Sequence, residues 1–283
     1  MNTSLKHLSQ PQRDKLERAV TIIVRAVQPE KIILFGPAGL SGKGDHPAVP
    51  GSDAPAPVSG AFDLLVVSRQ GDRRSDYEMQ DLIENRCHEA VPVTALVHDI
   101  AYVNRRLAEG QFFFSTLYKD GVLLYDAHVT PLTRPCPPDL VKVRTLAMKD
   151  YLRWSQQGRA FFRSAGFNRD NREWKVAAFL LHQAAEHVYQ AILLAFTGYK
   201  PTTHNLDKLR RYTNRFSADL AMVFPRDNAE EDELFRRLLS GYVDARYKEE
   251  FTISEEEISQ LLERIGRLIE IAEKVCFDHL ASL

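Results

Sequence analysis

The sequence contains few cysteines and no long apolar run. Its 283 residues include three cysteines, which lie far apart and lack the spacing of metal ligands. A sparse, odd-numbered set is typical of reduced thiols in a cytosolic protein, not of a disulfide framework. No run of about 18 apolar residues occurs, and residues 1–7 contain no hydrophobic signal core. We therefore expect a cytoplasmic protein with no membrane partner.

An excess of either charge is also lacking. The chain has 37 Lys and Arg against 38 Asp and Glu, a net charge of −1. This balance gives no global electrostatic reason to expect nucleic acid, so an RNA partner has no support from net charge, although local basic clusters could still bind phosphate. The hydrophobic fraction of 44% is ordinary for a soluble globular protein, and the length allows two domains with separate cores.

Two short apolar runs dominate the first half of the chain. Residues 31–36 and 61–67 are almost continuously apolar, which predicts neighbouring buried strands. The segment between them is rich in Gly, Pro, Ser and Ala, so no further element is expected there. A helix capped by Ser9 precedes these strands, and a helix over residues 72–89, a strand over 91–97 and a helix capped by Asp99 follow them. We predict a small mixed sheet with helices.

The first strand ends Leu34-Phe35-Gly36-Pro37, and the second begins Ala61-Phe62-Asp63. These two segments resemble the minimal nucleotidyltransferase domain of the polymerase-beta superfamily. In the family these segments read Phe-Gly-Ser and Ser-Asp-x-Asp-Leu. The resemblance implies that Gly36 lets the backbone approach a nucleoside triphosphate and that Asp63 binds Mg²⁺.

Three positions depart from this family pattern. Pro37 replaces the serine that would contact phosphate, the first carboxylate of the acidic pair is absent, and Thr94 stands where the third is expected. One carboxylate of three holds a pair of metal ions poorly, because both ions need bridging oxygens. Asp45 or Asp53 in the loop could substitute. We predict a degenerate domain without transferase activity, which requires no cofactor; the alternative is an active enzyme that uses Asp63, Mg²⁺ and a nucleoside triphosphate.

Proline marks the boundary between the two halves. Residues 127–139 hold four prolines and almost no periodicity, as in a semi-rigid linker. We predict a first domain over residues 1–128, a linker over 129–139 and a second domain over 140–283. Every long segment of the second domain has helical periodicity, so we expect an antiparallel bundle of helices over residues 140–167, 173–196, 205–215, 230–249 and 254–279. The predicted fold class is α+β.

The helical half contains three separated motifs rich in polar and aromatic residues. They are Phe179-Leu-Leu-His182-Gln183-Ala-Ala-Glu186-His187-Val-Tyr189, then Gly198-Tyr-Lys200-Pro-Thr-Thr203-His204-Asn-Leu206, then Tyr242-Val-Asp244-Ala-Arg246-Tyr247. They occur in the order found in the HEPN domain family, and the segment from about 140 to 280 resembles its sacsin-type, nucleotide-binding members. The resemblance implies nucleotide binding and a homodimer formed through helix faces. A nucleotidyltransferase-like domain fused to HEPN is an arrangement known from bacteria.

The ribonuclease branch of this family carries an arginine and a histidine separated by four to six residues. None of the nine histidines has an arginine at that spacing, so RNA cleavage is not predicted. The nucleotide-binding branch remains. Its candidate residues offer cations for phosphate, a ring for stacking on a base, and polar groups one helical turn apart. They are His182, Gln183, Glu186, Lys200, His204, Arg246 and Tyr247.

Each candidate also has a purely structural interpretation. Gln183 and Glu186 could tie neighbouring helices together, His204 could belong to a helix N-terminus, and Arg246 could pair with Asp244 or Glu186. Three functions remain open at this point. The first is non-catalytic binding of a nucleotide or polyphosphate, the second is nucleotidyl transfer to a protein or RNA, and the third is a dimerising interaction module.

Overall fold

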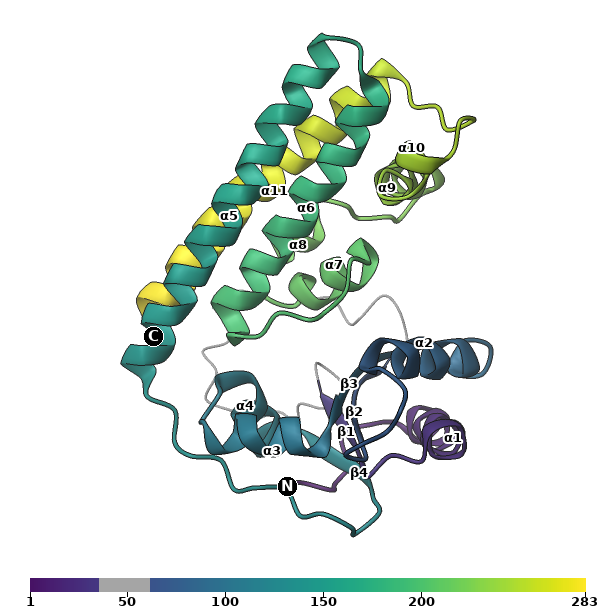
Figure 1. Cartoon of the computed structure of the whole chain (residues 1–283), viewed down its shortest axis with the longest axis vertical. Helices are drawn as coiled ribbons and strands as arrows, with labels where there is room; N and C mark the ends of the chain where they lie inside the picture. Colours follow the sequence, from purple (N-terminus) through teal and green to yellow (C-terminus); the bar gives the residue numbers. More distant parts are fainter. Residues whose placement is uncertain (36–61) are drawn as a thin grey trace. The chain divides into compact units, whose positions relative to one another are not determined.

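The structure is a computed structural model that describes residues 1–35 and 62–283 (Figure 1). Contacts divide the chain into two compact units. The sheet unit ends at Asp139 and the helical unit runs from Leu140 to Leu283. Gly36, Asp45 and Asp53 lie outside the described residues. In the described ranges no helix is long and apolar enough to span a bilayer.

The sheet unit is built on four strands in the order β3-β2-β1-β4. Strand β1 pairs antiparallel with β2 and β4, while β2 and β3 run parallel, so the sheet is mixed as predicted. The central strands are buried because nearly every residue in them is apolar. The strands are β1 Lys31–Phe35, β2 Phe62–Ser68, β3 Val93–Asp99 and β4 Val122–Asp126.

The helices of this unit begin where the sequence offers caps. Helix α1 follows Ser9, whose backbone N–H donates to Oε1 of Gln12 at 2.9 Å. Helix α2 crosses between the parallel strands, and Ser75 caps it by accepting from the N–H of Glu78. The remaining helices follow β3. The bounds are α1 Gln10–Val27, α2 Asp76–Cys87, α3 Ile100–Ala108 and α4 Phe112–Asp120.

Helix α4 and strand β4 are absent from the elements predicted for this unit. The aromatic triplet at residues 112–114 hides the helical period of α4, although Phe113 and Phe114 are buried as core residues. Gly121 joins α4 to β4. A Cβ there would lie 2.5 Å from the carbonyl oxygen of Leu117 and 2.9 Å from Ile33, so only glycine fits this close approach.

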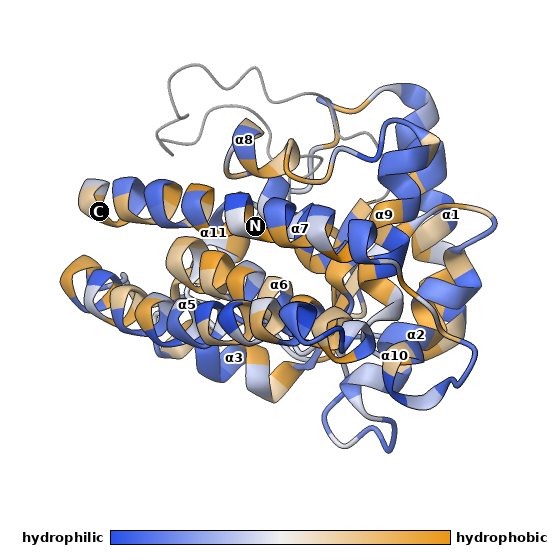
Figure 2. Cartoon of the chain, turned by 90° about the horizontal axis from the view of Figure 1, so that it is seen from above, coloured by the Kyte–Doolittle hydropathy of each residue, from blue (hydrophilic) through white to orange (hydrophobic). Residues whose placement is uncertain are grey.

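Three long helices form the framework of the helical unit, and α6 packs against both α5 and α11 (Figure 1). Gly198 ends α6 in the left-handed conformation, as the sequence predicts. Along α5 and α11, apolar and polar residues alternate with the helical period (Figure 2). The bounds are α5 Leu140–Asp170, α6 Trp174–Thr197, α7 Leu206–Asn214, α8 Ala218–Ala221, α9 Ala229–Ser240, α10 Asp244–Tyr247 and α11 Glu255–Ser282.

The prediction of one helix over residues 230–249 is wrong. Helix α9 ends at Ser240, and the single turn α10 begins at Asp244. Gly241 lies between them, and a Cβ there would be 2.7 Å from the carbonyl oxygen of Ala178. The backbone therefore packs directly against α6 at Gly241, which ends α9 and redirects the chain toward the polar residues of α6.

Candidate functional site

Polar residues interrupt the apolar surface of α6 over three turns. His182, Glu186 and Gln190 recur at intervals of four residues, so they lie on one side of the helix. All three are at most 3% exposed. A buried polar side chain is costly unless it is hydrogen-bonded, so each of these groups needs partners within the fold.

Glu186 is the centre of a hydrogen-bonded group. Its Oε1 lies 2.9 Å from Nδ1 of His204 and 3.2 Å from the Nε2 donor of Gln190. Its Oε2 accepts from Nε2 of Gln183 at 3.4 Å and lies 3.9 Å from Nδ1 of His182. We call these five residues the Glu186 cluster. Glu186 thus fixes His204, which comes from the segment before α7 and is otherwise exposed.

Tyr242 covers this cluster with its ring. The ring stacks on His182 with centroids 4.9 Å apart and on His204 with centroids 5.4 Å apart. Tyr242 directly follows Gly241, whose backbone packs against α6. The close approach at Gly241 therefore places Tyr242 over both histidines.

Arg246 adds a cation to the same place. Its guanidinium carbon lies 4.4 Å from the centroid of Tyr242, 5.0 Å from Phe179 and 5.0 Å from Tyr247. Its Nε donates to the carbonyl oxygen of Tyr242 at 2.5 Å. Arg246 has no ion pair among the described residues, because Asp244 pairs with Lys248 at 2.9 Å and Glu186 with His204.

One comparison with known protein families bears on the helical unit. Residues 151–275 match the HEPN domain family. This part of the chain is a HEPN domain. The prediction from the three motifs is confirmed, and the Glu186 cluster and Arg246 lie within the matched residues.

The other comparisons add little. No curated protein matches the chain. A solved structure that is similar to it is the crystal structure of a nucleotidyltransferase-like protein from Exiguobacterium sibiricum 255-15, at 15% sequence identity. The similarity covers 94% of this chain and 78% of that one, with a TM-score of 0.27. A similarity at that score carries no argument, so the nucleotidyltransferase interpretation still rests on the motifs at β1 and β2 and on the small mixed sheet.

A second aromatic group of the HEPN domain lies on α5 and α6. Lys200 Nζ lies 4.9 Å from the centroid of Trp154, and His187 lies 5.0 Å from Trp154 and from Phe161 between ring centroids. His187 also forms a hydrogen bond with the carbonyl oxygen of Gln183, at 2.8 Å from Nδ1. Lys200 has no ion pair in the part of the chain that the structure describes. It is therefore a second cation held on an aromatic ring.

Burial changes the protonation of one member of the Glu186 cluster. Removal from water, together with the nearby His204 and Arg246, lowers the pKa of His182 to about 3, and removal from water is the largest cause. His182 is therefore neutral at pH 7 and packs against Tyr242 as an uncharged ring. Burial disfavours the charged form because a cation loses its hydration there.

The HEPN domain brings most of the predicted site residues together. His182, Gln183, Glu186 and His204 meet directly, and Arg246 joins them through Tyr242. Tyr247 is 74% exposed and contacts Arg246. Sequence reasoning did not select Tyr242, Trp154 or Gln190 as site residues. The one signal for Gln190 was its place four residues after Glu186.

Among the described residues of the sheet unit, the strand positions in register with Asp63 hold no carboxylate. Asp63 of β2 is in register with Phe35 of β1 and with Thr94 of β3, and Thr94 is fully buried. The structure thus places Thr94 next to Asp63, where the third carboxylate of the pattern is expected. Within residues 1–35 and 62–283, no group of three or more His, Cys, Asp or Glu side chains could hold a metal ion.

Proposed function

We propose that the HEPN domain binds a nucleotide, or another compound with a phosphate group, at the Glu186 cluster and Arg246, without transferring it. The observation that carries this proposal is that Arg246 is a cation without an ion pair among the described residues. Its side chain lies on three aromatic rings, and no carboxylate among the described residues neutralises it. Its Nε is used by the backbone, which leaves the two terminal nitrogens to donate to phosphate as a fork.

His204, which also stacks on Tyr242, supports phosphate binding. Since Nδ1 of His204 is held by Oε1 of Glu186, the second ring nitrogen remains for a ligand. The carboxyl group that holds it is buried, while the ring itself is 66% exposed. The cluster therefore orients a surface imidazole from within the core. Because Nδ1 donates to the carboxylate, the second nitrogen donates to phosphate only when the ring carries both protons, and a fixed ring loses less entropy on binding than a mobile one.

The aromatic rings supply the means to hold a base. Tyr247 is the most exposed ring beside Arg246 and is the one that can hold a base, whereas Tyr242 already contacts His182, His204 and Arg246. Stacking on such rings tolerates any base, because every base has a π face. The site chemistry therefore specifies a phosphate and an aromatic ring, and a nucleotide combines the two.

A thermal-shift screen tests this function. The full chain is heated with ATP, GTP, CTP or UTP, with and without Mg²⁺, at nucleotide concentrations up to 1,000 times an assumed Kd. A nucleotide at 100 times its Kd raises the free energy of unfolding by about 2.7 kcal/mol. We expect at least one nucleotide to raise the melting temperature, and Arg246→Ala to abolish the rise. Lys248→Ala is the matched control, because Lys248 is an exposed cation two residues away that is paired with Asp244. No rise with any nucleotide would remove this function.

Nucleotidyl transfer by the sheet unit is the second candidate, supported by Asp63, the second residue of β2. Incubation with labelled nucleoside triphosphates, Mg²⁺ and cell lysate tests it. Label incorporated by the wild type and lost in Asp63→Asn would establish an enzyme and overturn the non-catalytic proposal.

A homodimer, implied by the HEPN resemblance, is compatible with both candidates and belongs to the proposal. Light scattering of the full chain measures it directly. A monomeric mass at micromolar concentration would remove the dimer, and with it the interaction-module alternative.

A further inference from the structure

His204 is the exposed member of the Glu186 cluster. Its side chain is 66% exposed, whereas that of Glu186, which holds its Nδ1 at 2.9 Å, is 4% exposed. A buried carboxyl group therefore controls an imidazole that meets solvent and ligand. Imidazole is the side chain that ordinarily changes charge between about pH 5 and 8, so its protonation can decide how well this site binds an anion.

The hydrogen bond to Glu186 decides which ring nitrogen of His204 carries the first proton. An ionised carboxylate only accepts hydrogen bonds, so Nδ1 donates, and Nε2 of the neutral ring has a lone pair that repels phosphate oxygens. The other neutral tautomer would set the lone pair of Nδ1 against Oε1 of the buried carboxylate at 2.9 Å. A second proton, taken from solvent onto Nε2, makes this nitrogen a donor and leaves the bond to Glu186 intact.

Besides Glu186, the groups that face His204 among the described residues keep one charge state from pH 6 to pH 8. Tyr242 stacks on both histidines of the cluster, and burial, as the largest cause, lowers the pKa of His182 to about 3, so His182 stays neutral. Arg246 lies 4.4 Å from the centroid of Tyr242, and an arginine keeps its charge throughout. The two amides of the cluster do not titrate. A proton gained here between pH 8 and pH 6 therefore enters the pair of Glu186 and His204.

We infer that nucleotide binding at the Glu186 cluster takes up one proton, at Nε2 of His204, so that the affinity falls as the pH rises from 6 to 8. The inference rests on the proposed nucleotide-binding function and adds its regulation. An imidazole that titrates near pH 6.5 is about three quarters protonated at pH 6 and about 3% protonated at pH 8. A site that requires the proton therefore loses at most about 25-fold in affinity over this range.

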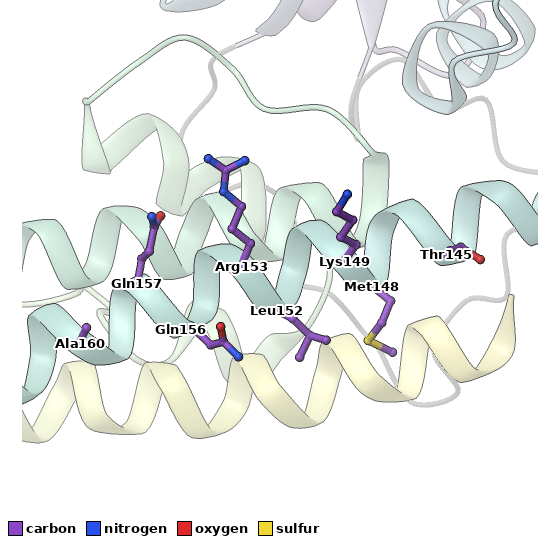
Figure 3. A pocket seen from close by; sticks show the side chains of 8 residues that line it. All are labelled: Thr145, Met148, Lys149, Leu152, Arg153, Gln156, Gln157 and Ala160. Atoms are coloured by element: carbon purple, nitrogen blue, oxygen red, sulfur yellow. The ribbon is translucent and has the colours of Figure 1, made fainter.

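A hollow of about 720 Å³ along α5 is the alternative place for a phosphate in the helical unit. Figure 3 shows Lys149 and Arg153 extending to one side of this helix. Lysine and arginine side chains ordinarily keep their charge from pH 6 to pH 8, and the residues that line the hollow include no histidine. Binding there would not depend on protonation of the protein in this range, which distinguishes the hollow from the Glu186 cluster.

Isothermal titration calorimetry of the full chain with ATP, GTP, CTP and UTP, each at pH 6.0 and pH 8.0, tests the inference. The ratio of the affinities at pH 6.0 and pH 8.0 should be about 10- to 25-fold larger in the wild type than in His204→Asn. Asparagine can still donate to Glu186 but does not titrate. The terminal phosphate of the nucleotide itself titrates near about pH 6, equally with both proteins, so the comparison removes its contribution.

A second measurement counts the proton directly. Titrations at pH 7.5 in Tris and in Hepes, whose ionisation enthalpies differ, give the number of protons taken from the buffer for each nucleotide bound. The wild type should take up nearly one proton more than His204→Asn, because the second proton enters only at Nε2 of His204. A purely structural role of His204 would leave this number unchanged.

Two controls locate the effect. His128→Gln removes an imidazole that also lies near a carboxylate, 3.9 Å from Asp126, and should keep the pH dependence of the wild type, as should Lys149→Gln with Arg153→Gln. Equal affinity ratios in the wild type and in His204→Asn overturn the inference while nucleotide binding stands. A pH dependence lost in the α5 variant also overturns it, since the phosphate would then lie on α5. Binding of no nucleotide at either pH removes the proposed function itself, and the inference with it.

Discussion

Replacement of His182 changes how the stability of the helical unit depends on pH. The folded state keeps His182 neutral, because burial lowers its pKa to about 3 from an ordinary 6.5. The unfolded chain takes up a proton at this side chain below about pH 6.5. Between those two values the unfolded state binds more protons, so the free energy of unfolding falls as the pH is lowered.

The magnitude follows from the two pKa values. Each pH unit well inside this window costs about 1.4 kcal/mol, so acidification from pH 7 to pH 5 costs about 2 kcal/mol at this one residue. The groups that face His182 are Glu186 on its own helix, His204 before α7, and Arg246 on α10. All three groups are present in the wild type and in the variant alike, so a difference between the two proteins isolates His182.

Urea unfolding followed by tryptophan fluorescence provides the assay. The chain has two tryptophans, Trp154 and Trp174, and both lie in the helical unit, so the signal reports that unit alone. We expect His182→Gln to lose about 2 kcal/mol less than the wild type between pH 7 and pH 5. His128→Gln, at a side chain 87% exposed in the sheet unit, should behave like the wild type.

Equal losses in the wild type and in His182→Gln would refute this reasoning. Such a result would mean that the folded protein protonates His182 at the same pH as the unfolded chain. The ring would then have access to water, and the Glu186 cluster would not be the dry network from which His204 is oriented.

Three further changes test the packing around the sites. Gly241→Ala should destabilise the helical unit by about 1–3 kcal/mol in urea, because the added Cβ meets the carbonyl oxygen of Ala178 at 2.7 Å; wild-type stability would contradict the close approach. Glu186→Ala leaves the buried Gln190 amide without its acceptor and should cost about 1–3 kcal/mol in the same assay, whereas no loss would show that water replaces the carboxyl group. Asp126→Ala removes the partner of the buried Lys31 ammonium, at 2.7 Å, and should lower the melting temperature of the sheet unit measured by circular dichroism; an unchanged temperature would mean that Lys31 finds another acceptor.

Local sequence signals predicted the helices and strands whose ends have a chemical cause. Ser9 and Ser254 each precede a residue able to close a capping box, and α1 and α11 begin after them. Gly198 ends α6 because it accepts the left-handed conformation there. The buried strands were also found, since a short apolar run with β-branched residues favours few other structures.

The missed elements are those whose cause lies elsewhere in the chain. The break after Ser240 depends on how closely the backbone at Gly241 approaches α6. The helical pattern across residues 230–249 does not predict that contact. Likewise β4 exists because β1 offers an unpaired edge, with Lys31 in register with Asp126. Pairings of this kind are long-range, so the local sequence does not specify them.

The site residues could be predicted individually, but not their order of importance. His182 and Glu186 recur with the same period as the core residues of α6, so the pattern marks them as buried without saying why a buried position is polar. The buried position is polar because a side chain from another segment forms a hydrogen bond there. Glu186 receives His204 from eighteen residues away, and the ring that covers both histidines is Tyr242, which the same pattern assigns to the core. A polar network on one helix therefore becomes a site only when a second segment brings it a surface group, and at this site Gly241 and Tyr242 make that connection.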